Sequence, residues 1–336
     1  MPVPALSAYM TNWNSLAQGY PIEAALRSLL RFAGEVVVLD AGSRDGSYEL
    51  LLRLHAEDWR LRVMREALDV HDAGWALTYD LALVQQARAA CHGDYLWQAE
   101  PFEVVSDGDA RKIRYCLDYL DPTTPVLALP SYEYWGSTEW VRRDQYPGTP
   151  KLSIRAPWLE HGLPRGFRAT DEHGALYALP YASLAASYID TRSDEPPAYS
   201  SVLDDEIEAM REVRVQSDRY EALFHDQLDD LPVVHNFQWY AIDAELRRLR
   251  DYWSRFHGSF YRSRAVSAWP FFDKPWSDVS DQDVLLRAVE LEVDGPAALG
   301  LDIDYPSRMQ ARMDVPEAVR PWLERSRCSQ GSLALC

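Results

Sequence analysis

A loop rich in acids, glycines and serines follows a short apolar segment near the start of the chain. Val36 to Leu39 is an uninterrupted apolar run rich in β-branched residues, as expected of a strand buried on both faces of a parallel sheet. Asp40 ends the run, and residues 41–47 read Ala-Gly-Ser-Arg-Asp-Gly-Ser. Open α/β sheets bind ligands at this end of a strand, and glycine lets backbone N–H groups approach a ligand closely. The loop could contact a nucleoside, or Asp45 or Ser47 could simply cap the next helix.

A second group of acids follows the apolar segment 95–97, where the sequence reads Gln98-Ala99-Glu100-Pro101-Phe102-Glu103. Carboxylate oxygens are ligands that divalent cations such as Mg²⁺ and Mn²⁺ prefer, so these acids could hold such an ion or could form only a polar turn. His235 follows a second apolar run, where a histidine could be structural or, as a neutral imidazole, a ligand of manganese.

The elements that must position these residues alternate between strand and helix. The apolar patterns predict strands at 5–10, 36–39, 61–64, 95–97 and 126–129, and helices at 22–30, 47–54, 77–90, 109–120, 203–224 and 242–256. This order predicts right-handed βαβ units and a mostly parallel open α/β sheet flanked by helices. We expect the chain to divide into segments 1–130 and 131–240 and a helical, aromatic-rich C-terminal extension over 241–336.

The bulk composition narrows the partners and the compartment. The chain has 336 residues, 47% of them hydrophobic, and a formal net charge of -18, which disfavours binding through nucleic-acid phosphates. No apolar run is long enough to span a bilayer, and the N-terminus has no signal-peptide pattern. The four cysteines are scattered, with no pair at metal-ligand spacing. These features predict a cytoplasmic protein with reduced thiols.

Four segments of the first third, read together, resemble family 2 glycosyltransferases. They are Thr11-Asn12-Trp13-Asn14, the segment 37–47, Asp72-Ala73-Gly74 before a helix bearing Asp80, and Gly93-Asp94-Tyr95 before the acidic turn. The resemblance covers about residues 5–110 and implies a GT-A fold, a nucleotide-sugar donor such as a UDP sugar, and a divalent cation. It makes segment 1–130 the nucleotide-sugar-binding half and segment 131–240 the acceptor-side half of one domain. It implies a base contact for Asp40, within a nucleotide site made of Thr11, Asn12, Asn14, Asp40, Gly42, Ser43, Asp45, Gly74, Asp80 and Gln98.

The chain departs from this family at the Asp-x-Asp motif that holds the cation. Either Gln98-Ala99-Glu100 replaces the motif, or Glu100 and Glu103 bracket it and Phe102 replaces a ligand. Both alignments retain Glu100, so the resemblance implies that Glu100 contacts the cation, Mn or Mg, which would neutralise charge on the leaving diphosphate. It also implies that a histidine in a late segment, here His235, completes the metal shell or contacts the diphosphate. Loss of one acid is compatible with weaker metal binding, a metal-independent mechanism or a non-catalytic site. Inverting transfer also needs a carboxylate that removes the acceptor proton, and Asp171 and Glu172 are the candidates.

The sequence therefore predicts a glycosyltransferase that moves a sugar from a nucleotide diphosphate donor to an acceptor hydroxyl with inversion. The acceptor stays open among a glycan, a small molecule and a modified nucleic-acid base. A non-catalytic nucleotide-sugar-binding protein with a degenerate metal site is the alternative from another class. A nucleotidyltransferase would carry a Gly-rich basic loop near the first strand, and residues 5–19 have none.

Overall fold

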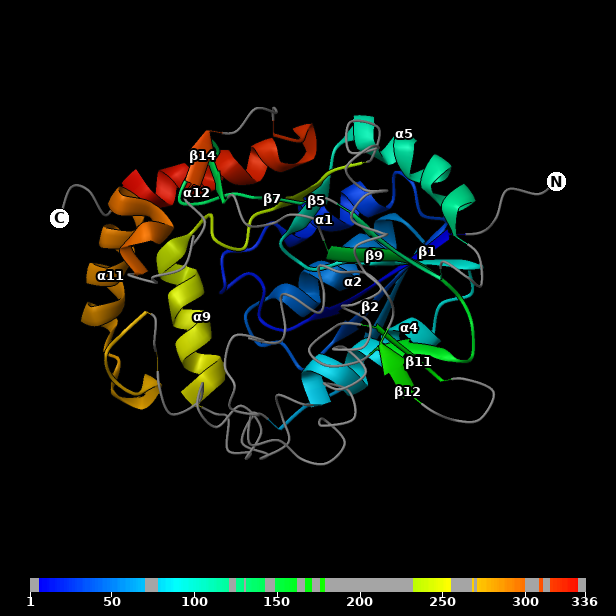
Figure 1. The fold of residues 1–336 in the computed structure, drawn as a ribbon, viewed down its shortest axis with the longest axis horizontal. Coiled ribbons are helices and arrows are strands. Elements are labelled where there is room, and N and C mark those ends of the chain that lie inside the picture. The colour runs from blue at the N-terminus through cyan, green and yellow to red at the C-terminus, as the bar shows by residue number, and fades with distance from the viewer. Residues whose placement is uncertain are drawn as a thin grey trace.

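A six-stranded sheet forms the centre of the fold (Figure 1). The computed structural model describes residues 6–69, 78–120, 125–129, 131–142, 149–161, 167–170, 176–178, 232–254, 268, 271–299, 308–310 and 315–331. The strand order is β3-β2-β1-β4-β9-β6, with β1 (Leu6–Asn12), β2 (Glu35–Asp40), β3 (Leu61–Arg65), β4 (Tyr95–Gln98), β6 (Val126–Leu129) and β9 (Thr149–Ile154). The first four strands are parallel, whereas β9 runs antiparallel to both of its neighbours. The expectation of a mixed α/β fold with a mostly parallel sheet is confirmed.

Helices pack on both faces of this sheet, as alternation along the strands requires. Ala8, Met10 and Val38 belong to the same core as α1 (Ile22–Leu29) and α2 (Ser47–Glu57). Tyr9 and Val37 face the other way and pack with the π-helical turn η1 (Thr78–Leu83) and with α4 (Val84–Ala89). The single helix predicted over 77–90 is thus, in its described residues, a short π-helix followed by a short α-helix.

The direction of chain growth reverses at β1. From β1 the chain adds β2 and then β3 on one side, whereas β4 pairs with the opposite side of β1. Such a reversal is the topological switch point of an open α/β sheet, and ligands bind there beside the carboxyl ends of the strands. The switch point in this chain lies between β1 and β4.

Smaller sheets surround the central one. Their orders are β5-β13-β7, β10-β11-β12 and β14-β8. The strands are β5 (Glu103–Val105), β7 (Ser131–Glu133), β8 (Trp140–Arg142), β10 (Leu159–His161), β11 (Phe167–Thr170), β12 (Leu176–Ala178), β13 (Val234–Asn236) and β14 (Arg308–Gln310). Between β5 and β6, the helix α5 (Asp107–Cys116) begins after Ser106, whose hydroxyl accepts from the Asp109 N–H, and runs into the 3-10 turn η2 (Leu117–Tyr119). In the three-stranded sheet β5-β13-β7, β13 brings His235 between strands from earlier in the chain.

The C-terminal third contributes helices and a second aromatic core. Its elements are α9 (Ile242–Ser254), η3 (Trp276–Asp278), α11 (Asp281–Asp294), η4 (Gly295–Leu299), η5 (Glu317–Val319) and α12 (Arg320–Gly331). Figure 1 shows α9 and α11 side by side at one end of the molecule. Trp135 stacks on Trp239 with ring centroids 4.8 Å apart, within a core that includes Trp276 and Leu291.

The predicted division into 1–130, 131–240 and 241–336 stays a prediction. Val319 and Leu323, from the C-terminal segment, belong to the same buried core as the central sheet. The helix predicted over 203–224 lies outside the described residues. Among the helices of the described ranges, none combines the length and the apolar character that crossing a membrane requires.

Candidate functional site

The carboxyl ends of the parallel strands place the predicted nucleotide residues at one edge of the sheet. Asn12 and Asp40 lie directly across from each other at the ends of β1 and β2, and Arg65 follows at the end of β3. Gln98, at the end of β4, lies across from Tyr9, three residues before the end of β1. Because neighbouring strands are spaced by roughly 4.8 Å, β2 and β4 lie about 10 Å apart across β1, and Gln98 is also set back from Asp40 by three residues, or roughly 10 Å, along the strands. The switch point separates them.

Asp40 is the most constrained side chain of this edge. It is 0% exposed, and one carboxylate oxygen accepts the Asn12 Nδ2–H at 2.7 Å. The other oxygen accepts the backbone N–H groups of Gly42 at 3.1 Å and Ser43 at 2.9 Å, and the Arg65 Nε lies 3.6 Å from it. Asp40 therefore organises the loop that follows β2. A direct contact between Asp40 and a nucleoside base stays a prediction.

The loops after β1 and β2 are bonded to each other. The Ser43 hydroxyl accepts from Asn12 Nδ2 at 3.1 Å and from the Asn14 N–H at 2.9 Å, and the Asn14 side-chain oxygen accepts the Arg44 N–H at 2.8 Å. Asn14 has a φ of 50°, in the left-handed region that asparagine tolerates better than most residues. Its position thus depends on both its backbone and its side chain.

Two further residues of the loop after β2 join these loops. Asp45 accepts the Ala17 N–H at 2.7 Å and the Ser47 N–H at 3.0 Å, which ties the loop after β1 to the start of α2. The N-cap of α2 is Gly46, and it has no side-chain cap hydrogen bond. Gly42 has a φ of 83°, and a Cβ there would lie 3.5 Å from the Ala67 backbone. Since 3.5 Å is an ordinary contact distance, the left-handed backbone is what favours glycine at this position.

Arg65 is a cation at this edge that the sequence interpretation did not single out. Its side chain is 42% exposed, its guanidinium carbon lies 3.9 Å from the centre of the Tyr48 ring, and it donates to the Ser43 carbonyl at 3.1 Å. A guanidinium held in this way can bind a phosphate or a carboxylate. The sequence signal that could have identified Arg65 is its position directly after the predicted strand 61–64, which matches the position of Asp40 after the predicted strand 36–39.

The acidic turn after β4 is closed by hydrogen bonds and by a lysine from β9. Gln98 Nε2 donates to Glu100 Oε1 at 3.4 Å, and the Glu100 N–H donates to Glu103 Oε2 at 2.9 Å. Lys151 Nζ lies 2.6 Å from Glu103 Oε1 and 2.8 Å from Glu103 Oε2. All four side chains are buried. Burial raises the pKa of Glu103, and the Lys151 ammonium opposes that shift.

His235 is a buried, neutral histidine. It is 0% exposed, its Nδ1 lies 2.9 Å from the Tyr134 hydroxyl, and the two rings are stacked. Burial lowers the pKa of His235 to about 4, although the Asp109 charge acts in the opposite direction. Its Nε2 has no hydrogen-bond partner within the described part of the chain.

The register of β13 places His235 on the other face of its sheet from Glu103. Asn236 lies across from Glu103, and His235 across from Val104. Successive side chains of a strand point to opposite faces, so His235 and Glu103 point away from each other. The described residues include no group of three or more His, Cys, Asp or Glu side chains placed to hold a metal ion.

The residues of the turn do not fit a Mn²⁺ or Mg²⁺ ion. These ions take several oxygen ligands, with carboxylates preferred, but both oxygens of Glu103 contact an ammonium. Gln98 directs its amide nitrogen to Glu100, so the side chain beside Glu100 is a neutral donor and not a second carboxylate. The metal role of Glu100 and His235 stays a prediction from the sequence.

The remaining predicted residues divide between described and undescribed parts of the chain. Thr11 is buried within β1. Asp80 belongs to η1, and its side chain lies outside the description. Gly74 and the two candidate bases, Asp171 and Glu172, lie outside the described residues.

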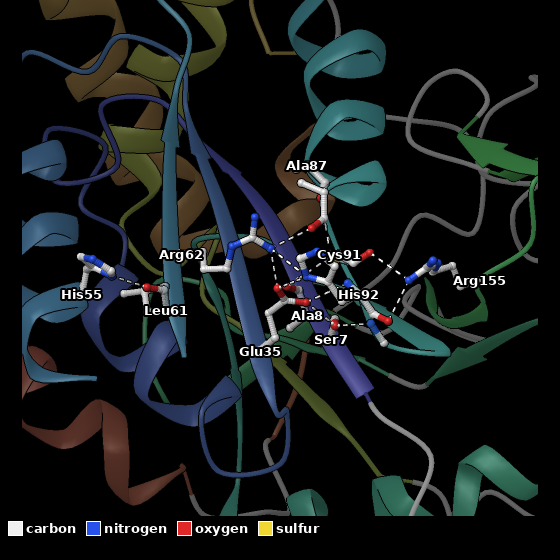
Figure 2. Close-up of polar contacts among 12 residues, drawn as sticks. Ser7, Ala8, Glu35, His55, Leu61, Arg62, Ala87, Cys91, His92 and Arg155 are labelled. Atoms are coloured by element: carbon white, nitrogen blue, oxygen red, sulfur yellow. Dashed lines mark hydrogen bonds and ion pairs between the residues drawn. The ribbon is translucent and has the colours of Figure 1, made fainter. Parts of the chain in front are cut away.

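The opposite, amino-terminal edge of the sheet holds a different polar cluster (Figure 2). Glu35, the first residue of β2, accepts the Ser7 hydroxyl at 2.7 Å, the His92 N–H at 2.9 Å and an Arg62 nitrogen. Arg155 donates to the His92 carbonyl at 2.7 Å. Burial acts to raise the pKa of Glu35, but the bonds from Ser7, His92 and Arg62 outweigh it and lower that pKa to about 2. β2 thus has a hydrogen-bonded acid at each end, half-buried at Glu35 and fully buried at Asp40.

Comparisons with known proteins gave structural resemblance alone. The chain matches no family model and no curated protein. Among solved structures, residues 1–349 of TarS from S. aureus with UDP are 10% identical, covering 86% of this chain and 71% of that one, with a TM-score of 0.33. The same TarS fragment with UDP-GlcNAc is 12% identical, with 75% and 81% covered and a TM-score of 0.36. A mannosyltransferase, PcManGT from Pyrobaculum calidifontis, with GDP-Man and Mn²⁺ is 14% identical, with 86% and 87% covered and a TM-score of 0.35.

Proposed function

We propose that this chain is a glycosyltransferase that moves a sugar from a nucleotide diphosphate donor, a UDP sugar, to an acceptor hydroxyl with inversion. The observation that carries the proposal is the switch point between β1 and β4. The bonded loops around Asn12 and Asp40 lie on one side of it, and the turn with Gln98 and Glu100 lies on the other. The resemblance of residues 5–110 to family 2 glycosyltransferases supports the same conclusion.

The nucleoside lies against the loops after β1 and β2 in this proposal. Asp40 fixes those loops through Asn12 and Ser43. Asn14, Gly42 and Asp45 are half-buried there and offer backbone and side-chain groups to the nucleotide. Donor phosphates would lie between Arg65 and the turn that holds Glu100.

The transfer itself is a single displacement. The acceptor hydroxyl oxygen attacks the anomeric carbon, and the bond from that carbon to the diphosphate oxygen breaks. Asp171 or Glu172 takes the acceptor proton, and the nucleoside diphosphate leaves with the bonding electron pair. The acceptor is a glycan, a small molecule or a modified nucleic-acid base, and screening these three classes with one donor distinguishes them.

The two acids of β2 make a matched test of where the nucleotide binds. Asp40→Asn places an amide N–H against the Asn12 Nδ2 donor and disturbs the loops at the carboxyl edge, whereas Glu35→Gln disturbs the amino edge. Calorimetric titration of UDP should show binding at least tenfold weaker in Asp40→Asn and changed less than twofold in Glu35→Gln. Thermal melts show whether each variant is folded. Equal effects of the two substitutions, or the absence of UDP binding by the wild type, would refute the proposal.

A non-catalytic nucleotide-sugar-binding protein is the second candidate. The observation in its favour is that the Glu100 carboxylate accepts from the neutral amide of Gln98, while Lys151 Nζ contacts both carboxylate oxygens of Glu103. The two candidates differ in donor turnover, because a transferase releases UDP slowly from a UDP sugar even when water is the acceptor. Binding of the sugar donor with no UDP released over hours, with and without added Mn²⁺, would favour the binding protein.

A further inference from the structure

We propose that Lys151 acts as a built-in cation at the turn after β4, in the place of a divalent metal ion, and that this turn consequently binds no Mn²⁺ or Mg²⁺. The inference also predicts that the nucleotide donor binds without a metal ion, and this part rests on the proposed function. The part that concerns the metal alone depends only on the residues of the turn.

The first step is the route by which Lys151 reaches the turn. Leu152 of β9 lies across from Trp97 of β4, so Lys151 comes beside the carboxyl end of β4. Its Nζ contacts both oxygens of Glu103, at 2.6 and 2.8 Å. Lys151 and Glu103 are 3% and 6% exposed, which keeps water from weakening the pair. The lysine is therefore held in the turn by the sheet itself.

The second step is the competition between this ammonium and a metal ion. A divalent ion at Glu103 would have to displace Lys151 Nζ, which would then be a buried charge without its partner. If Lys151 stayed, the two cations would repel each other at short range in a water-poor environment. Both outcomes oppose metal binding.

The third step concerns the other ligands that a metal would need. Gln98 offers a neutral amide and turns its N–H toward Glu100, and the Glu100 N–H is itself directed at Glu103 Oε2. His235 points to the opposite face of its sheet from Glu103. The carboxylates of Glu100 and Glu103 are therefore the oxygen ligands that a metal ion could use only after the ammonium is removed from Glu103.

The direct experiment is a Mn²⁺ titration of the full chain without nucleotide, with free Mn²⁺ measured by electron paramagnetic resonance. We expect no binding by the wild type up to 1 mM Mn²⁺. Lys151→Met frees the Glu103 carboxylate and should bind Mn²⁺ with a Kd at least tenfold below that upper limit. The control Lys151→Met/Glu103→Gln removes both charges and should lose that gained site.

Two results would overturn the proposal. One is binding of Mn²⁺ by the wild type with a Kd below 1 mM that Glu103→Gln abolishes. The other is a folded Lys151→Met variant, judged by its thermal melt, that gains no Mn²⁺ binding.

A second measurement on the wild type covers the case in which Lys151→Met does not fold. The Kd for UDP should agree within twofold between EDTA and 1 mM Mn²⁺, and a gain of tenfold or more with Mn²⁺ would overturn the proposal. Failure to bind UDP in both arms would count against the proposed function, and the wild-type Mn²⁺ titration would still decide the metal inference.

Discussion

Glu35→Gln should destabilise the protein by about 2 to 3 kcal/mol at pH 7, in a way that depends on pH. Glu35 lies at the amino edge of the sheet and is the acceptor for Ser7, His92 and Arg62. Glutamine has nearly the same shape but cannot carry the charge that these donors favour. The substitution therefore tests the polar cluster of Figure 2 without opening a cavity.

The magnitude follows from the pKa of Glu35, which is lowered from 4.5 to about 2. A difference of this size between folded and unfolded states corresponds to about 3 kcal/mol. The side chain is 15% exposed, so little is lost to screening, but Arg62 is half exposed and justifies the lower end of the range. Because the pKa is depressed by folding, this stability is fully present above pH 4.5 and is lost as the pH falls toward 2.

Urea unfolding of the wild type and the variant at a series of pH values measures this effect. The difference in unfolding free energy should be largest at pH 7 and should fall to less than half of that at pH 3, where the unfolded chain binds a proton at Glu35. Taking the difference cancels the other titrating groups that both proteins share. A difference that stays constant from pH 7 to pH 3, or that is below about 0.5 kcal/mol at pH 7, would refute this account of Glu35.

Three further substitutions test single features by urea unfolding. Gly42→Ala should cost about 1 to 2 kcal/mol because alanine is strained at a φ of 83°, whereas Gly108→Ala within α5 should be neutral or stabilising; equal costs would contradict this. Tyr134→Phe should cost about 1 to 2 kcal/mol, because His235 Nδ1 loses its partner inside the core; an unchanged midpoint would exclude that bond as a source of stability. Ser280→Ala should cost about 1 kcal/mol through loss of the capping box of α11, with the exposed Ser277→Ala as the control that should show no loss.

The sequence predicted the first four strands of the sheet because their signals are local. The apolar run from Val36 to Leu39 predicts a strand that is buried on both faces. The helices between the strands are predicted by the helical spacing of their apolar residues. Parallel order then places the strand ends together, and so Asn12, Asp40 and Gln98 share an edge as expected.

The interactions that decide the chemistry of the site come from distant parts of the chain. Lys151 reaches Glu103 from β9, and strand periodicity does not tell which neighbour a strand will pair with. His235 was expected near Glu100, but its direction depends on the register of β13 against β5, and a shift of one residue would reverse it. The hydrogen bonds that saturate Asp40 come from a turn geometry and from Asn12, which a linear pattern does not display.

The position of β9 between β4 and β6 has a consequence for the order of assembly. β6 precedes β9 in the chain, yet among the described strands β9 is the one neighbour through which it joins the central sheet. During synthesis, the four parallel strands can therefore pair before β9 is made. Until then β6 has no strand to pair with, and Glu103 lacks the Lys151 ammonium. Docking of β9 would form the pairing with β6 and the ion pair between Lys151 and Glu103 in the same step. This step would come late, because long-range contacts form after the local contacts between neighbouring elements.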